Sequence, residues 1–175
     1  MKMKKITDPE LENQLSKITL SLAGASLFSK IKVILTDNIG CLGYFGFNFQ
    51  SAEGIIMVNV KAKKMLNDKE ERSIVFATLS HEIGHIKHCL ENVAFYLKLK
   101  KGGDSFLEIN DEVELSADRE ALPLLKKFYE NPKEILLKQI EFAVQTVMQC
   151  EYATEEDKKA TVALARKRRE ALNFS

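Results

Sequence analysis

The residues best suited to chemistry are two histidines and a glutamate in an HExxH pattern at positions 81–85. On a helix, side chains four residues apart share a face, so His81 and His85 can bind one Zn²⁺ through imidazole nitrogens. Glu82 lies about a hundred degrees further round the helix than His81. From there its carboxylate can take a proton from a water molecule whose pKa zinc lowers to roughly 7. The pattern predicts a catalytic zinc site in which Glu82 is the general base.

The surroundings of the pattern decide whether it is more than a chance match. Residues 73–79 lead into it without Gly or Pro. Apolar residues recur at helical spacing, namely Val75, Leu79, Ile83, Ile86, Leu90 and Val93. A polar line follows another face and contains Thr78, His81, His85, His88 and Asn92. We therefore expect an amphipathic helix, opening at Asn67-Asp68 and running to about residue 97, that turns the motif toward a cleft.

A catalytic zinc site needs a third protein ligand. The remaining histidine, His88, lies too far along the helix axis to reach the same ion, so a carboxylate or a cysteine must serve. The acidic candidates follow a Gly-Gly loop and are Asp111, Glu112, Glu114, Asp118 and Glu120. Glu114 can bind zinc while Asp118, four residues later, accepts the second N–H of a ligating histidine. An acidic, solvated helix face explains these residues equally well, and the residues alone leave both interpretations open.

Length, charge and cysteine content exclude several classes of protein. The chain has 175 residues, which predicts a single domain over residues 1–175 with a sizeable core. A formal net charge of +1 favours neither nucleic acid nor a membrane surface as a partner. No apolar stretch is long enough to span a bilayer. Three cysteines without a CxxC pair indicate a reducing compartment, so we expect a cytoplasmic protein.

The elements around the motif predict an α+β fold. Asp8-Pro9 is typical of a helix start, and the helix continues to about Ala25. Three segments have the composition of short strands, at residues 31–35, 44–49 and 55–60. Helical patterns return from residue 109 with Pro123 as an interruption, and then at residues 135–152 and 154–172. We expect a small three-stranded, mostly antiparallel sheet packed on the active-site helix, with a helical C-terminal half.

Three smaller features complete the pattern. Phe45, Phe47 and Phe49 alternate along one strand, which predicts a sheet core. Residues 154–157 resemble a helix capping box with Asp in place of Glu. The basic run at residues 166–169 is typical of a solvated helix face near a C-terminus.

The paired motifs resemble a known class of enzymes. HExxH at positions 81–85 followed by Glu114-x-x-x-Asp118 resembles the HExxH…ExxxD signature of gluzincin metallopeptidases. The finer pattern LSHEIGH, with ExExxADR at residues 112–119, is similar to the catalytic domains of HtpX-like and CAAX prenyl proteases. The segment at residues 54–60 before the motif helix also resembles the short ImmA/IrrE peptidases. The similarity covers about residues 44–125.

The resemblance implies a zincin-like fold and assigns roles to individual residues. It makes His81, His85 and Glu114 the zinc ligands, Glu82 the general base, and Asp118 the partner of a ligating histidine. The sequence departs from the HtpX-like enzymes in lacking transmembrane helices, and ImmA/IrrE proteins often have another residue where Asp118 stands. It also has no histidine after the motif helix to stabilise an oxyanion. A tyrosine (Tyr44, Tyr96, Tyr129 or Tyr152) or an arginine would have to do so.

The expected function is that of a zinc metalloendopeptidase that hydrolyses a protein or peptide substrate with narrow, regulatory specificity. In such folds the substrate extends along an exposed sheet edge, for which residues 55–60 are the candidate strand. A first alternative is a binding module of the same fold, with restricted or no activity, that acts on a regulatory protein. A second is a structural zinc site closed by Cys89, although a small buried hydrophobe is the simpler role for that residue. No other substrate-binding residue and no oligomeric state is indicated.

Overall fold

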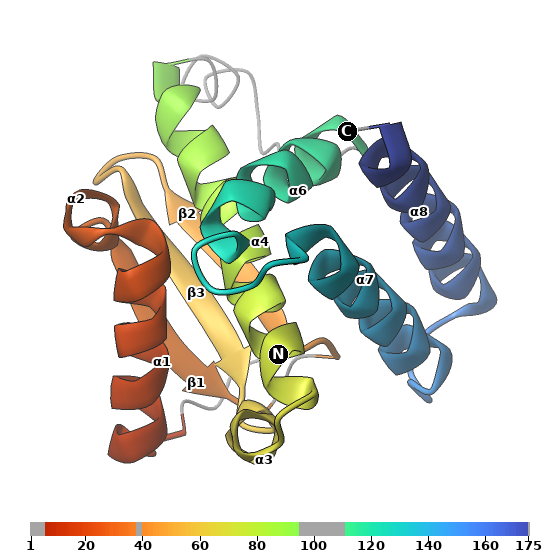
Figure 1. Cartoon of the computed structure of the whole chain (residues 1–175), viewed down its shortest axis with the longest axis horizontal. Coiled ribbons are helices and arrows are strands. Elements are labelled where there is room, and N and C mark those ends of the chain that lie inside the picture. Colours follow the sequence, from red (N-terminus) through yellow and green to blue (C-terminus); the bar gives the residue numbers. More distant parts are fainter. Residues whose placement is uncertain (1–5, 38–39, 95–110, 175) are drawn as a thin grey trace.

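The computed structural model describes residues 6–37, 40–94 and 111–174, in which the chain forms an α+β fold (Figure 1). These residues contain seven helices, namely α1 (Pro9–Ala23), α2 (Ala25–Phe28), α3 (Ala62–Asn67), α4 (Glu71–Glu91), α6 (Asp111–Leu125), α7 (Pro132–Met148) and α8 (Glu155–Phe174). The strands are β1 (Ile31–Thr36), β2 (Gly43–Asn48) and β3 (Glu53–Asn59). The predicted Gly-Gly loop, a helix start at residue 109 and Tyr96 lie outside the described residues. The motif helix α4 ends at Glu91 with Asn92 as its C-cap, earlier than the expected end near residue 97.

The three predicted strands are confirmed to within two residues at each end, but their arrangement differs from the prediction. The order is β1-β3-β2, with β1 parallel and β2 antiparallel to β3. The sheet is therefore mixed rather than mostly antiparallel. The expectation that residues 55–60 form an edge is wrong, because β3 hydrogen bonds to a strand on each side. Among the described strands, β1 and β2 are the edges.

Side-chain hydrogen bonds cap α1 and α8 where the sequence predicts their starts. The carboxylate of Asp8 accepts the backbone N–H of Leu11 at 3.1 Å, and Pro9 opens α1. At the start of α8, Thr154 and Asp157 exchange hydrogen bonds, which confirms the capping box. The motif helix α4 begins at Glu71, later than expected, because α3 ends just before Asp68. The Asp68 carboxylate then accepts the N–H groups of residues 70 and 71.

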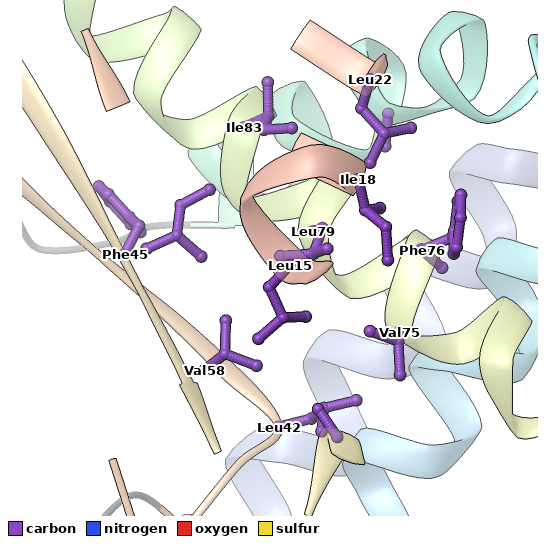
Figure 2. Packing of buried hydrophobic residues seen from close by; sticks show 14 of the residues in the cluster. Leu15, Ile18, Leu22, Leu42, Phe45, Val58, Val75, Phe76, Leu79 and Ile83 are labelled. Atoms are coloured by element: carbon purple, nitrogen blue, oxygen red, sulfur yellow. The ribbon is translucent and has the colours of Figure 1, made fainter. Parts of the chain in front are cut away.

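The apolar core lies between the sheet and the helices α1 and α4 (Figure 2). Leu15 of α1 and Leu79 of α4 are fully buried there, and Val58 of β3 meets them from the sheet. Gly54 of β3 has no room for a side chain, because a Cβ atom there would lie 2.6 Å from Ile86 of α4. The close approach of strand and helix fixes the depth at which α4 lies against the sheet.

The C-terminal helices pack on the other side of α4 (Figure 1). The helix α6 crosses α4 in backbone contact, since a Cβ atom on Gly84 would lie 2.6 Å from the carbonyl oxygen of Ala117. Pro123 does not interrupt α6, which continues to Leu125. The helices α7 and α8 then form a neighbouring pair. None of the helices in the described ranges combines the length and the apolar character needed to span a bilayer.

Candidate metal centre

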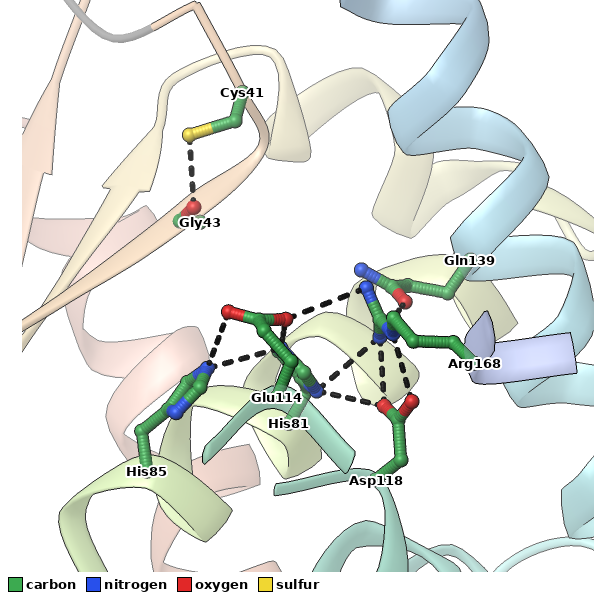
Figure 3. A network of polar contacts seen from close by, with 8 residues as sticks. All are labelled: Cys41, Gly43, His81, His85, Glu114, Asp118, Gln139 and Arg168. Atoms are coloured by element: carbon green, nitrogen blue, oxygen red, sulfur yellow. Dashed lines mark hydrogen bonds and ion pairs between the residues drawn. The ribbon is translucent and has the colours of Figure 1, made fainter. Parts of the chain in front are cut away.

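Two helices bring three potential metal ligands together. His81 and His85 project from α4, and Glu114 meets them from α6 (Figure 3). The two imidazole Nε2 atoms are 3.0 Å apart, and each lies close to one oxygen of Glu114, at 3.2 Å from His81 and 3.3 Å from His85. The three donor atoms lie within 4.8 Å of one another. Within the described residues they are the one group of His, Cys, Asp and Glu side chains arranged to hold a metal ion.

Asp118 lies behind His81, one turn after Glu114 on α6. Its Oδ1 is 2.8 Å from His81 Nδ1, and both side chains are buried. A carboxylate accepts hydrogen bonds, so Nδ1 carries a proton, and Nε2 is the nitrogen that faces Glu114. A histidine that binds a metal ion through Nε2 needs its remaining proton on Nδ1.

The electrostatics of the cluster fit a bound cation. If His81 and His85 are both neutral, their unprotonated nitrogens face each other and the Glu114 carboxylate. This arrangement is repulsive unless a proton or a metal ion lies between the atoms. Burial and the charge of Arg168 lower the pKa of His81, but its hydrogen bonds to Asp118 and Glu114 outweigh them and raise it to about 9. The pKa of His85 falls to about 4, chiefly through burial. Burial opposes the ionisation of Glu114, yet its hydrogen bonds from both histidines hold its pKa well below the usual range.

Glu82 lies beside the cluster under the start of β2. It is 6% exposed, and burial raises its pKa to about 7. The backbone of β2 comes so near that a Cβ atom on Gly43 would lie 3.3 Å from Glu82 Oε1 and 2.5 Å from Thr78 Cγ2. A carboxyl group with a pKa near neutrality can both accept and return a proton. Glu82 thus lies next to, but not among, the candidate ligand atoms.

Cys41 is a neighbour of Glu82 that the sequence did not single out. Its thiol donates to the carbonyl oxygen of Gly43 at 2.9 Å (Figure 3). Burial, followed by the negative charge of Glu82, raises the pKa of the Cys41 thiol to about 12. The group is therefore a neutral thiol rather than a metal-binding thiolate.

His85 is held differently from His81. The ring of Phe45 stacks on it with centroids 4.4 Å apart and planes 14° from parallel. His85 Nδ1 is buried and has no hydrogen-bond partner among the described residues. Phe45 is a core residue as predicted, and it also covers one face of a candidate ligand.

Arg168 is the member of the site that sequence reasoning missed. It is 6% exposed, so the expectation of a solvated helix face is wrong at this position, although Arg166 and Lys167 are exposed. Its guanidinium donates to both oxygens of Asp118, at 2.7 and 2.6 Å. The buried residues Ala165 and Leu172 stand three residues before it and four after it, which places all three on one helix face. That spacing is a signal from which the burial of Arg168 could have been predicted.

The other acidic candidates for a third ligand lie away from the cluster. Asp111 and Glu112 are exposed at the start of α6, where Asp111 pairs with Lys167. Glu120 pairs instead with Lys87 of α4 at 2.5 Å.

Cys89 and His88 are also outside the group of ligand atoms. Cys89 is fully buried in the apolar core, and burial raises its thiol pKa to about 12. Of the tyrosines considered for oxyanion stabilisation, Tyr44 and Tyr152 are exposed, and Tyr129 packs on Phe76.

Comparison of the chain with models of protein families, with curated proteins and with solved structures found no match.

Proposed function

We propose that this protein is a zinc metallopeptidase with a zincin-like fold, which hydrolyses peptide bonds of a protein or peptide substrate. The supporting observation is the meeting of His81 and His85 with Glu114, thirty or so residues away, while Glu82 stands beside them with a pKa near neutrality. Two imidazoles and a carboxylate form a donor set that catalytic zinc uses in peptidases. Three free cysteines are in keeping with action in the cytoplasm.

Each residue of the site has a separate role in the proposed reaction. Zinc held by the two histidines and Glu114 would supply a Lewis acid for the substrate carbonyl and lower the pKa of water. Glu82 takes the proton of the attacking water and passes it to the leaving amine. Asp118 keeps His81 in the tautomer that offers Nε2 to the metal.

The edge strand β2 is the natural place for the substrate. Among the described strands it pairs with β3 alone, so an extended peptide could add to its outer edge by backbone hydrogen bonds. Its first residues pass over Glu82, and Phe45 within it covers His85. A peptide added along β2 would therefore pass close to the cluster, which assigns to β2 the role expected of residues 55–60.

The position of Cys89 favours a catalytic over a structural zinc site. Its thiol lies in the apolar core and outside the group of potential ligands, so a four-ligand site closed by this cysteine does not form here. Three protein ligands leave a coordination position open for chemistry. A binding module of the same fold is the second candidate. Its function would not depend on the Glu82 carboxylate, whereas that of the enzyme would.

The test is the Glu82→Gln protein, with Glu112→Gln as a matched control on an exposed acid. We expect Glu82→Gln to bind one zinc ion, as wild type does, and to lose peptide cleavage by about a hundredfold or more, because it lacks the proton acceptor. Metal analysis measures the zinc content, and cleavage of a peptide library with product sequencing measures the peptidase activity. Cleavage by Glu82→Gln at the wild-type rate would disprove the mechanism. Full cellular activity of this variant would support the binding module instead.

A further inference from the structure

Arg168 is a buried charge that ties three helices together. It extends from α8 and donates to Asp118 of α6 through Nε and Nη2, and to Gln139 of α7 through Nη2 at 3.2 Å. Burying a guanidinium is costly unless such partners replace its water. The contacts include a two-pronged pair with a carboxylate and a third bond to an amide oxygen, and Nη2 also lies 3.3 Å from His81 Nδ1 (Figure 3). Such a planar fork fixes the orientation of the carboxylate as well as its position.

The same oxygen of Asp118 serves both Arg168 and His81. Oδ1 accepts from Arg168 Nη2 at 2.6 Å and from His81 Nδ1 at 2.8 Å. Because the guanidinium fixes the carboxylate plane, it also fixes the direction in which the imidazole N–H must point. The opposite nitrogen of His81 then faces Glu114. The orientation of one candidate ligand therefore depends on a residue 87 positions later in the chain.

Arg168 also approaches the cluster itself. Its Nη1 atom lies 3.6 Å from Glu114 Oε2, too far for a hydrogen bond but near enough for attraction. The guanidinium thus faces Asp118 on one side and Glu114 on another, and compensates part of the negative charge that two buried carboxylates concentrate there.

We propose that Arg168 is a positioning residue of the metal centre, which acts through Asp118 to orient His81 and makes α8 part of the site. This inference rests on the proposed zinc site. It predicts that metal affinity depends on a helix that supplies no ligand.

The experiment uses the full chain with Arg168→Gln, Arg168→Lys and the control Arg169→Gln. Arg169 lies next to Arg168 on α8 but is half exposed and pairs with Glu141. Zinc affinity is measured by competition with a chromogenic chelator, and site geometry by the visible absorption spectrum of the Co²⁺-loaded protein. We expect Arg168→Gln to lose about ten- to a hundredfold in zinc affinity and to change the Co²⁺ spectrum, while Arg169→Gln matches wild type. Arg168→Lys should recover part of the affinity, because a lysine keeps the charge without the fork.

A double-mutant cycle with Asp118→Asn tests whether Arg168 acts on His81 through Asp118. If Arg168 acts through Asp118, Arg168→Gln should add little to the loss of affinity already caused by Asp118→Asn. Losses that add fully, or wild-type affinity and spectrum in both Arg168 variants, would overturn the inference. If Arg168→Gln fails to fold, Arg168→Lys decides the question, because it retains the buried charge.

The outcomes separate this inference from the proposed function. A wild-type protein that takes up no zinc refutes the metal site itself. A wild-type protein that binds zinc tightly, together with Arg168 variants that bind it equally well, refutes the positioning role alone.

Discussion

The two sides of α4 are equally buried but are held in different ways. On one side Leu79 and Ile83 pack among apolar side chains of α1 and the sheet (Figure 2). On the other side His81 and His85 meet the charged groups of α6 and α8, although they are 4% and 2% exposed. Apolar contacts stabilise the fold whatever else is bound. The buried polar side brings two imidazole Nε2 atoms and a carboxylate close together, and a cation between them would relieve the repulsion of their lone pairs.

The difference teaches that burial alone does not identify a functional residue. What distinguishes the polar side is that its titratable side chains meet one another from helices that are far apart in sequence. The two sides should therefore respond differently to metal and to mutation.

The largest expected effect is on the polar side. Glu114→Ala removes a proposed zinc ligand. We expect zinc to stabilise the wild type by about 4 kcal/mol at a thousand times the dissociation constant, and this stabilisation should be lost in the variant. Thermal unfolding with and without zinc measures it, and Glu112→Ala, an exposed acid two residues earlier, is the control. Equal stabilisation of Glu114→Ala and wild type by zinc would remove Glu114 from the ligand set.

Leu79→Ala tests the apolar side. It leaves a cavity in the packed core and should lower the free energy of unfolding by about 3 kcal/mol, with and without zinc alike. Denaturant unfolding measures the loss, and chelator competition should find nearly unchanged zinc affinity in the folded protein. A large loss of zinc affinity without a loss of stability would mean that the two sides are not separate.

Gly84→Ala tests the contact that joins α4 to α6. The added Cβ atom would lie 2.6 Å from the backbone oxygen of Ala117, and backbone cannot turn aside as a flexible side chain does. We expect a loss of about 2 kcal/mol in stability, despite the better helix propensity of alanine, together with weaker zinc binding. Gly46→Ala is the control, since its nearest neighbour would lie 3.9 Å away. Unchanged zinc affinity in a destabilised Gly84→Ala would show that the helix spacing does not set the ligand geometry.

The smallest effect should come from Phe45→Leu, which removes the ring stacked on His85 but keeps the site apolar. We expect zinc affinity to fall by about fivefold, in line with roughly 1 kcal/mol for an aromatic contact. Phe47→Leu is the control, because Phe47 lies on the same strand but makes an edge-to-face contact with Phe49 instead. Chelator competition measures the zinc affinity of both variants. An equally large loss in Phe47→Leu would mean that disturbing the sheet, rather than losing the ring on His85, weakens zinc binding.

Local patterns predicted much of the fold. The three strands, the start of α1 and the capping box of α8 follow from turn residues and side-chain caps within a few positions of each element. The order of the strands did not follow in the same way. Whether β3 is central or at an edge depends on which strand pairs with it, and residues 55–60 carry the same apolar composition in either case.

The sequence by itself determined that His81 and His85 share a helix face with Glu82 beside them, because helical periodicity is a local property. Only the tertiary structure decided that Glu114, rather than another acid of α6, reaches those histidines, and that Arg168 is buried against Asp118. The crossing of α4 and α6 at Gly84 brings Glu114 to the histidines, and the packing of α8 brings Arg168 to Asp118. Contacts between distant segments depend on how whole helices pack, which no short stretch of sequence encodes.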